Sequence, residues 1–397
     1  MREKDLLIWL SNHKEIGALS ICRLFDRYKT AEAILEAPFD ELKTVIPEKA
    51  AGLIKETERK VITEETERFK DRLLKEGFGI ITINDDLYPD NLKNIYEPPR
   101  ILYFKGNIQL LKEDKRIAIV GSRQATPYGR EAASYFAASF GKAGFTVVSG
   151  LAFGIDAAAH KAVLKDGGKT IGVMGSGINV IYPKGNTSIY MEMYEKGLVI
   201  SENGLDIGPF SFNFLIRNRI ISGMSEGVLV VEAREKSGSL ITADQALEQG
   251  RNVYAVPGRI NDPLSEGTNL LIKNGALISN NAETVIEDMI GISDFYDGRN
   301  KERDSEKKEK EKEEEKEKEK NHSKRKNDKK DDILVQPLDE NEKKIYKIIG
   351  SSDVFIDDII SITGLSPGVC IRGVIELMRG GFIKETERGY YIRRINL

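Results

Sequence analysis

The chain has 397 residues, a formal net charge of −3 at pH 7 and 40% hydrophobic residues. This length is sufficient for two or three domains with hydrophobic cores, and the charge excludes a protein that is basic over its whole surface. A nucleic-acid partner would therefore require a local basic patch. The two cysteines, Cys22 and Cys370, lie far apart in the sequence, which argues against a disulfide framework or a thiolate metal site.

The N-terminal segment predicts neither secretion nor membrane insertion. MREKDLLIWL mixes acidic with basic residues, and its apolar run is too short for a signal peptide. No later segment reaches the length of a membrane span. We therefore expect a cytoplasmic protein in a reducing compartment.

Residues 1–75 predict a small helical domain. Apolar residues recur at helix-like spacings from Leu6 to Ile54, with short breaks between the groups. The turn Val45–Glu48 has no glycine, which helix-hairpin-helix motifs use to approach a DNA backbone. A structural or protein-docking role is therefore favoured for this bundle. The following stretch, from residue 80 to residue 100, predicts a strand and a Pro-rich connection.

Residues 80–290 predict a second domain, in which short β-rich runs alternate with helical segments. The expected strands are Arg116–Val120, Phe145–Ser149, Thr170–Met174, Leu198–Ser201, Gly227–Val231, Asn252–Val256 and Ala276–Ser279. The expected helices are Gly129–Ala143, Ile155–Leu164, Thr187–Glu195, Phe212–Ser222, Leu240–Gln249 and Thr268–Asn274. This alternation predicts an α/β fold, a doubly wound Rossmann-like parallel sheet covered by helices on both faces. Ligands are expected beyond the carboxyl ends of the strands.

Glycine-rich turns and cationic side chains follow four successive expected strands. Free backbone N–H groups at such turns bind phosphate, and the forked guanidinium of Arg123 can do the same. We therefore predict an anion-binding crevice at this edge of the sheet. Its candidate residues are Gly121, Ser122, Arg123, Gly150, Gly175, Gly177, Lys184, Asn186, Arg217, Asn218 and Arg219.

Each candidate also has a purely structural interpretation. Any one of the glycines could serve only as a turn residue, and Arg123 could be an ordinary surface side chain. His160 is expected to pack within an Ala-rich helix, and Asp156 to cap that helix or complement its dipole. Glu232 ends a buried strand at the same edge and is expected to position the basic residues. The joint occurrence of these features favours a binding site without an acid–base pair.

The glycine spacing does not fit the common sites for small nucleotides. GVMGSG, at residues 172–177, has a GxxGxG spacing rather than GxGxxG, and no suitable acid follows it at a strand end. The chain also contains no GxxxxGK[ST] segment. We therefore expect an extended polyanion as ligand, with no cofactor, no metal and no catalytic residue.

The remaining C-terminal part predicts a linker and a third domain. Residues 297–332 are almost wholly Lys, Glu, Asp and Arg, and without apolar side chains they cannot offset the entropy of ordering. We expect a disordered linker, with a fluctuating charged helix as the alternative. Residues 336–397 predict a winged-helix-like domain, whose three helices and hairpin are expected at residues 341–349, 355–362, 366–378 and 382–394. Arg372 and Arg379 give its third helix positive charge but Glu376 lies between them, so DNA and protein both remain open as partners.

Motifs across residues 80–290 resemble the bacterial DNA-processing protein A family, DprA, also called Smf. The matching segments are VGSR and PYG at residues 120–129, SGLAFGIDAAAH at 149–160, GSGINVIYPKGN at 175–186, RNRIISGMS at 217–225, VVEAREKSGSLITADQALEQGR at 230–251, VYAVPG at 253–258 and EGTNLLIKNGA at 266–276. The helical beginning resembles the family's helix-hairpin-helix or SAM-like domain, and the end resembles its optional winged-helix domain. The charged linker departs from compact members.

The resemblance implies a recombination mediator rather than an enzyme. Members bind single-stranded DNA in the basic pocket of the Rossmann-like domain, form homodimers, and load the RecA recombinase onto strands covered by single-strand binding protein, notably in natural transformation. Tyr182 and Phe214 are the aromatic candidates for base stacking, with a core role as the alternative for Phe214. The resemblance maps the family's phosphate-contacting arginine onto Arg123, beside Gly121 and Ser122. It maps the family's pocket lysine onto Lys184. The family's RNR segment corresponds to Arg217, Asn218 and Arg219.

Two other functions remain open for the same sheet edge. One is a nucleotide-binding or nucleoside-processing Rossmann-like enzyme, although the PGGxGTxxE site of phosphoribohydrolases is absent. The other is a non-catalytic sensor of nucleotide second messengers. If the chain forms a homodimer, we expect its face in the C-terminal third of the α/β domain. The apolar candidates there are Ile260, Leu264, Leu270, Leu271 and Ile272, although most of them are expected to pack in the core.

Overall fold

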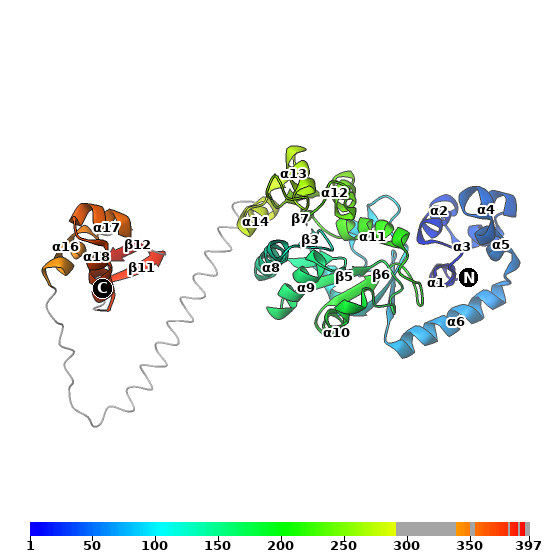
Figure 1. The fold of residues 1–397 in the computed structure, drawn as a ribbon. Helices are drawn as coiled ribbons and strands as arrows, with labels where there is room; N and C mark the ends of the chain where they lie inside the picture. The colour runs from blue at the N-terminus through cyan, green and yellow to red at the C-terminus, as the bar shows by residue number, and fades with distance from the viewer. Residues whose placement is uncertain (291–338, 350–353, 380–381, 388–389, 394–397) are drawn as a thin grey trace, which may run out of the picture. The chain divides into compact units, whose positions relative to one another are not determined.

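The computed structural model describes residues 1–290, 339–349, 354–379, 382–387 and 390–393 (Figure 1). These residues belong to two compact units, one within residues 1–304 and the other within residues 305–397. The predicted linker at residues 297–332 lies outside the described residues.

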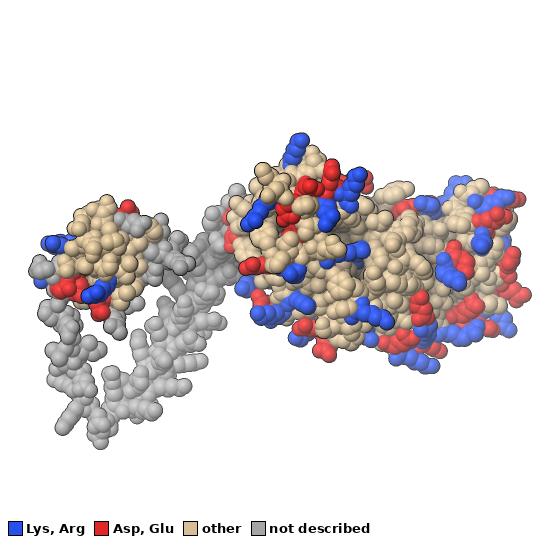
Figure 2. Space-filling view, viewed as in Figure 1, with Lys and Arg blue, Asp and Glu red and all other residues tan. Residues whose placement is uncertain are grey.

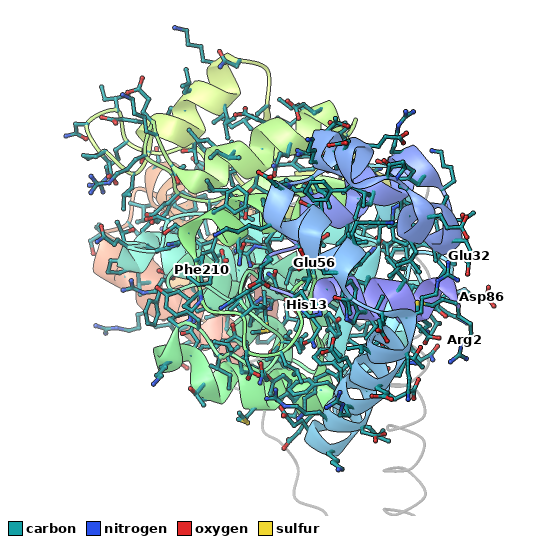
Figure 3. The ribbon with its side chains drawn as sticks, turned by 90° about the vertical axis from the view of Figure 1, so that its right-hand side faces the viewer. Arg2, His13, Glu32, Glu56, Asp86 and Phe210 are labelled. Carbon is teal, nitrogen blue, oxygen red and sulfur yellow. The ribbon has the colours of Figure 1, made fainter. Side chains whose placement is uncertain are left out.

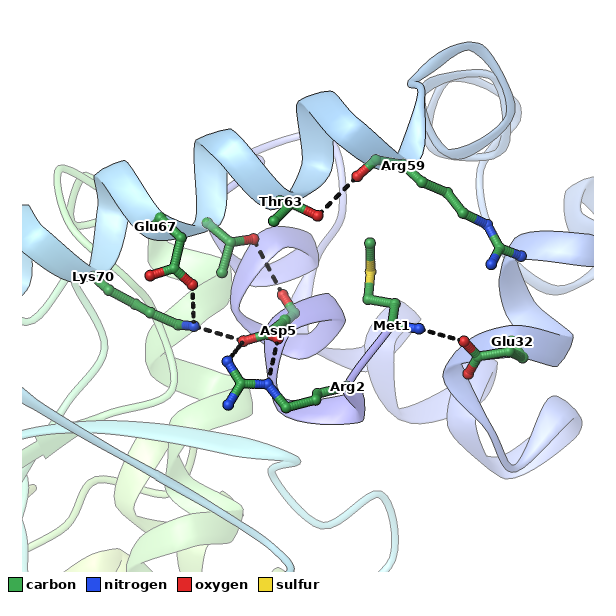
Figure 4. A network of polar contacts seen from close by, with 9 residues as sticks. Met1, Arg2, Asp5, Glu32, Arg59, Thr63, Glu67 and Lys70 are labelled. Carbon is green, nitrogen blue, oxygen red and sulfur yellow. Dashed lines mark hydrogen bonds and ion pairs between the residues drawn. The ribbon is translucent and has the colours of Figure 1, made fainter.

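The first unit begins with the predicted helical bundle. Its helices are α1 (Glu3–Ser11), α2 (Ala18–Tyr28), α3 (Ala31–Glu36), α4 (Phe39–Val45), α5 (Glu48–Glu56) and α6 (Arg59–Glu76). The apolar side chains of these helices form one core, which includes the fully buried Trp9 and Leu24. On the surface, the Asp5 carboxylate of α1 accepts hydrogen bonds from Arg2 and from Lys70 of α6 (Figure 4). These contacts tie the first helix of the bundle to its last.

After the bundle, residues 79–278 supply the strands of a nine-stranded sheet in the order β1-β2-β6-β5-β4-β3-β7-β8-β9. The strands are β1 (Gly79–Thr82), β2 (Ile101–Gly106), β3 (Arg116–Val120), β4 (Thr146–Ser149), β5 (Thr170–Met174), β6 (Leu198–Ser201), β7 (Gly227–Val230), β8 (Asn252–Ala255) and β9 (Leu277–Ile278). Strands β3 to β9 are parallel, as the alternation predicts.

The sheet differs from the expected all-parallel arrangement at one edge. There β2 pairs antiparallel with both β6 and β1. The connection between β1 and β2 contains only the short helix α7 (Asp90–Lys93), whereas neighbouring parallel strands need a long crossover. The domain is therefore a mixed-sheet α/β fold with a Rossmann-like parallel centre.

Helices cover both faces of the sheet (Figure 1). The helices are α8 (Pro127–Lys142), α9 (Ile155–Lys165), α10 (Thr187–Lys196), α11 (Ser211–Gly223), α12 (Gly238–Glu248), α13 (Glu266–Lys273) and α14 (Ala282–Ile290). Side chains of α8, α9 and α14 fill one core against the sheet, and those of α11 and α12 fill another. The winding of the chain reverses between β3 and β7, so that these two neighbouring strands form the topological switch point.

The helical bundle and the α/β domain share a continuous core. The ring of Phe69 on α6 packs edge-to-face on Tyr103 of β2, with 6.0 Å between the ring centroids. The Tyr103 hydroxyl also forms a hydrogen bond with Ser11 of α1. At the periphery, Arg72 of α6 pairs with Asp206 in the loop after β6. The bundle is thus fixed on the sheet rather than tethered beside it.

The second unit contains the expected three helices and hairpin strands. Its elements are α16 (Glu340–Ile348), β10 (Val354–Phe355), α17 (Ile356–Thr363), α18 (Pro367–Arg379), β11 (Ile383–Glu387) and β12 (Tyr390–Arg393). The sequence did not predict β10, which joins the hairpin in a sheet of order β10-β12-β11. Asp339 and Glu342 form a capping box at the start of α16. On α18, Ile371 and Ile375 are exposed beside Arg372 and Glu376, so its surface is apolar as well as charged.

Candidate functional site

A pocket of about 450 Å³ opens at the topological switch point between β3 and β7. Ligands of doubly wound sheets bind in this position, because neighbouring loops diverge there and leave a crevice. The pocket is bounded by the loop after β3, by α11, and by the loop that leads from β7 into α12. Its lining includes Gly121, Ser122, Arg123, Asp156, Phe214, Arg217, Asn218, Arg234 and Lys236.

The loop after β3 is held in place by Glu232, the predicted positioning residue. The Glu232 main-chain oxygen accepts a hydrogen bond from Ser122 N at 2.7 Å, and its carboxylate accepts one from Thr126 N at 2.9 Å. Thr126 in turn caps α8 by accepting a hydrogen bond from Gly129 N at 3.0 Å. These contacts of Glu232 are made with the loop and not with a basic side chain. They fix the backbone from which Arg123 projects.

Arg123 is exposed and lies over an aromatic ring. Its guanidinium carbon is 5.5 Å from the ring centroid of Phe214, a distance typical of a cation–π contact. The Phe214 ring is half-buried and lies 5.5 Å from that of Tyr182. Within the described part of the chain, no acidic side chain forms an ion pair with Arg123. Its charge is therefore available to a ligand.

The turn after β4 is built around two buried charges. The Asp156 carboxylate accepts hydrogen bonds from Gly150 N at 3.1 Å and from Ala152 N at 3.3 Å. Arg217 Nη1 donates to Gly150 O at 2.8 Å and also to Val173 O. Burial lowers the pKa of Arg217 to about 10, an effect that the nearby Asp156 opposes. Arg217 therefore stays charged at neutral pH.

These contacts change the expected role of the second turn. The sequence predicted free N–H groups for phosphate, but two of them are occupied by Asp156. A Cβ on Gly150 would lie 2.6 Å from Arg217 Nη2, so the glycine makes room for the guanidinium. Asp156 thus lies in the first turn of its helix, where its charge complements the dipole, but its hydrogen bonds go to the preceding loop and do not cap the helix. Arg217 lines the pocket, whereas Gly150 lies outside its lining and accepts a hydrogen bond from Arg217.

The RNR segment is divided between two environments. Asn218 lines the pocket, and its amide donates to Gly238 O at the start of α12. Arg219 is absent from the pocket lining and forms a buried ion pair with Glu202, with Nη2 at 2.7 and 2.8 Å from the carboxylate oxygens. Three successive residues spread over about 200° around a helix, so Arg217 and Asn218 reach the pocket while Arg219 points away from it.

Lys184 and Asn186 lie outside the pocket lining. Asn186 is buried, and its amide donates to Leu151 O at 2.9 Å and to Ala152 O at 3.0 Å. Lys184 is exposed on the 3-10 turn Lys184–Asn186. A Cβ on the neighbouring Gly185 would lie 2.8 Å from the Phe153 ring, which is itself 48% exposed. Lys184 is therefore an exposed cation near Phe153 and does not line the pocket.

The structure adds two cations that sequence reasoning missed. Arg234 and Lys236 are exposed and line the pocket from the loop after β7. Both residues follow an expected strand at the same edge of the sheet, and this position in the sequence could have predicted them as pocket residues. On the face of the molecule shown in Figure 2, acidic and basic side chains are interspersed. The positive lining is thus a local feature, as the low net charge requires.

The described residues form neither a metal site nor a membrane span. No group of three or more His, Cys, Asp or Glu side chains in those ranges is placed to hold a metal ion. Nor does any helix in them have the length and apolar character needed to cross a membrane. His160 is fully buried against Thr170, and burial lowers its pKa to about 3, in agreement with the predicted packing role.

Comparisons of sequence and of structure with known proteins give relatives from one family. DNA processing protein DprA of Bacillus subtilis is 44% identical over 215 residues, covering 54% of this chain and 72% of that protein. DNA processing protein DprA of Streptococcus pneumoniae is 44% identical over 209 residues, covering 53% and 73%. A crystal structure of the Streptococcus pneumoniae protein superposes with a TM-score of 0.58 at 34% identity, covering 73% of this chain and 98% of that one. The family model described as DNA recombination-mediator protein A matches residues 79–290, and the chain belongs to this family.

Proposed function

We propose that this protein binds single-stranded DNA in the switch-point pocket and acts there as a recombination mediator. The observation that carries the proposal is the exposed guanidinium of Arg123, which lies over Phe214 and has no acidic partner among the described residues. Arg234 and Lys236 add exposed positive charge to the same pocket. Unpaired cations beside an aromatic platform suit a strand whose phosphates and unstacked bases are both accessible.

The same groups favour binding without sequence preference. Arg123, Arg234 and Lys236 can contact phosphates, which carry no base identity. The ring of Tyr182 is 42% exposed and lies next to Phe214, so a base could stack there whatever its type. Affinity should therefore depend strongly on salt and weakly on sequence.

A binding role accounts for the pocket better than catalysis does. The carboxylate that lines it, Asp156, is buried and accepts two main-chain hydrogen bonds. Burial raises the pKa of Asp156, but its contacts hold a loop and do not face an exposed base or nucleophile. We infer a non-enzymatic protein without a cofactor. Binding or processing of small nucleotides is the alternative.

The proposal includes protein partners. A mediator must deliver its strand to a recombinase, so we infer the RecA recombinase as a partner, with single-strand binding protein on the incoming strand. We also infer a homodimer through the C-terminal third of the α/β domain. There Ile260 is 98% exposed and Leu270 36% exposed, whereas Leu264 and Leu271 are buried and so unsuited to a contact surface.

The first test measures binding of labelled oligothymidine by fluorescence anisotropy at several salt concentrations. We expect Arg123→Ala and Lys236→Ala each to weaken binding and to reduce the slope of log affinity against log salt by about 0.7, the value for one phosphate contact to a single strand. Lys165→Ala is the control, because Lys165 ends α9 at the opposite sheet edge. Wild-type binding by the double variant would refute the pocket assignment.

Two further measurements separate the alternatives. Free nucleotides that compete with the oligonucleotide at equal concentration would favour the small-nucleotide function. The mediator role is tested by adding the protein to RecA and single-stranded DNA coated with single-strand binding protein. We expect faster filament formation, and an unchanged rate at concentrations where the DNA is bound would reduce the function to passive binding.

A further inference from the structure

A second pocket, of about 560 Å³, lies where the helical bundle meets the α/β domain. One wall is the segment from Ser11 to Ile21, which joins α1 to α2. The other is the segment that runs from Glu202 after β6 to the first turns of α11. Figure 3 faces this side of the molecule and labels His13 and Phe210, one residue from each wall.

The second pocket has an apolar interior and an aromatic rim. Ile16, Leu19 and Ile207 are among the residues that line it. Phe210 and Phe212 also line it and remain 65% and 64% exposed. Two large aromatic side chains left in solvent beside a cavity mark a binding surface rather than a packing defect.

The charges at this pocket favour an anionic ligand. Lys14 is exposed at the pocket, and no described acidic side chain forms an ion pair with it. The carboxylate of Glu202 also lines the pocket, but it is buried and paired with Arg219. Helix α2 begins at the same place with Gly17 as its N-cap, which supplies no side chain to the first N–H groups of the helix.

The two pockets are neighbours on one helix. Arg217 lines both of them. At the start of α11, Phe212 lines the second pocket and Phe214 lines the first. A ligand that extends beyond the first pocket across this turn therefore enters the second one.

We propose that the second pocket receives the continuation of the same DNA strand, with bases on Phe210 and Phe212 and a phosphate at Lys14. This inference rests on the proposed function of the switch-point pocket. It gives the helical bundle a direct part in holding DNA, through the segment between α1 and α2 and not through the glycine-free turn between α4 and α5.

The test compares oligothymidines of about 4 to 16 nucleotides, the range of sites on single-strand binding domains. We expect the affinity of wild type to increase with strand length until the first pocket is filled, and to increase a second time once the strand is long enough to reach the second pocket. Phe212→Ala should remove this gain and weaken binding of long strands by about five-fold or more, the effect of losing one stacked base. Lys14→Ala should lower the salt slope by about 0.7 for long strands only.

Controls keep the outcomes distinct. Leu74→Ala removes a side chain that is 78% exposed on α6, and Lys165→Ala removes a charge from the far end of α9; both should behave as wild type. Melting temperatures matched to wild type establish that Phe212→Ala and Lys14→Ala are folded.

Wild-type binding of every length by Phe212→Ala and Lys14→Ala would overturn the inference while leaving Arg123→Ala to test the first pocket. Loss of free thymidine monophosphate binding in these two variants, with long strands unaffected, would also overturn it, because the ligand would then be a mononucleotide. Failure of wild type to bind any oligonucleotide would refute the proposed function itself.

Discussion

Arg219 offers a direct way to separate folding from DNA binding. The RNR motif assigns it to the ligand, but the structure buries it with Glu202, and both side chains are less than a tenth exposed. Arg219→Met removes the cation and leaves the carboxylate in an apolar setting. Breaking such a buried pair costs about 3–5 kcal/mol in the free energy of unfolding.

The double variant Arg219→Met with Glu202→Gln provides the matched control. Burial already raises the pKa of Glu202 and Arg219 opposes that rise, so the lone carboxylate of the single variant should become protonated more easily. Because this protonation removes the unpaired charge, we expect the free energy of unfolding to fall by about 3 kcal/mol, the lower end of that range. With both charges removed, most of the stability should return, because the desolvation of the carboxylate is no longer uncompensated.

Urea unfolding followed by fluorescence measures both effects. Trp9, the sole tryptophan of the chain, is buried in the core that the bundle shares with the sheet, so its emission reports unfolding of the first unit. The folded single variant should still bind oligothymidine with wild-type affinity and salt slope. Wild-type stability combined with a reduced salt slope would refute the reasoning and return Arg219 to the DNA site.

Two further predictions concern residues around the pocket. His160 has a folded-state pKa lowered to about 3 by burial, below its ordinary 6.5, so its contribution to stability is complete above about pH 6.5 and is lost as the pH falls toward 3. When the pH falls from about 7 to about 5, the free energy of unfolding of wild type should decrease by about 2 kcal/mol more than that of His160→Gln, measured by urea unfolding. Equal pH dependence of the two proteins would contradict the lowered pKa of His160. Gly154 has φ +79° and a Cβ there would lie 2.2 Å from Ser122 O, whereas Gly167, at φ +71°, has open space. Gly154→Ala should therefore lower the melting temperature more than Gly167→Ala, and equal losses would show that the close approach to Ser122 is unimportant.

Much of the fold could be predicted because the α/β domain repeats one simple pattern. β3, β5 and β6 have the expected bounds, since each is a short apolar run that ends at a polar or glycine residue. The antiparallel edge could not be predicted in the same way. Pairing of β2 with β6 depends on which edge of the parallel sheet is left uncovered, and that is a property of the assembled fold.

The sequence predicted where the candidate site lies, but it predicted only some of the contacts that its residues make. The glycine turns located the sheet edge, and Arg123 projects there as expected. Whether a backbone N–H remains free depends on long-range partners, and Asp156 and Glu232 occupy several of them. Arg234 and Lys236 were overlooked because their loop carries an acidic residue between them, which hides the local excess of positive charge in the sequence.

Two arginines of the switch-point pocket, Arg123 and Arg217, have different roles. Arg217 is buried, bound to two main-chain oxygens and close to Asp156, so it determines the shape of both pockets. Arg123 is exposed and can exchange water for a phosphate without disturbing the fold. Loss of DNA binding on removal of Arg217 would therefore not establish a contact, because the turn after β4 would lose its anchor as well. The salt slope distinguishes the two cases, because only a residue that neutralises a phosphate changes the number of counterions released.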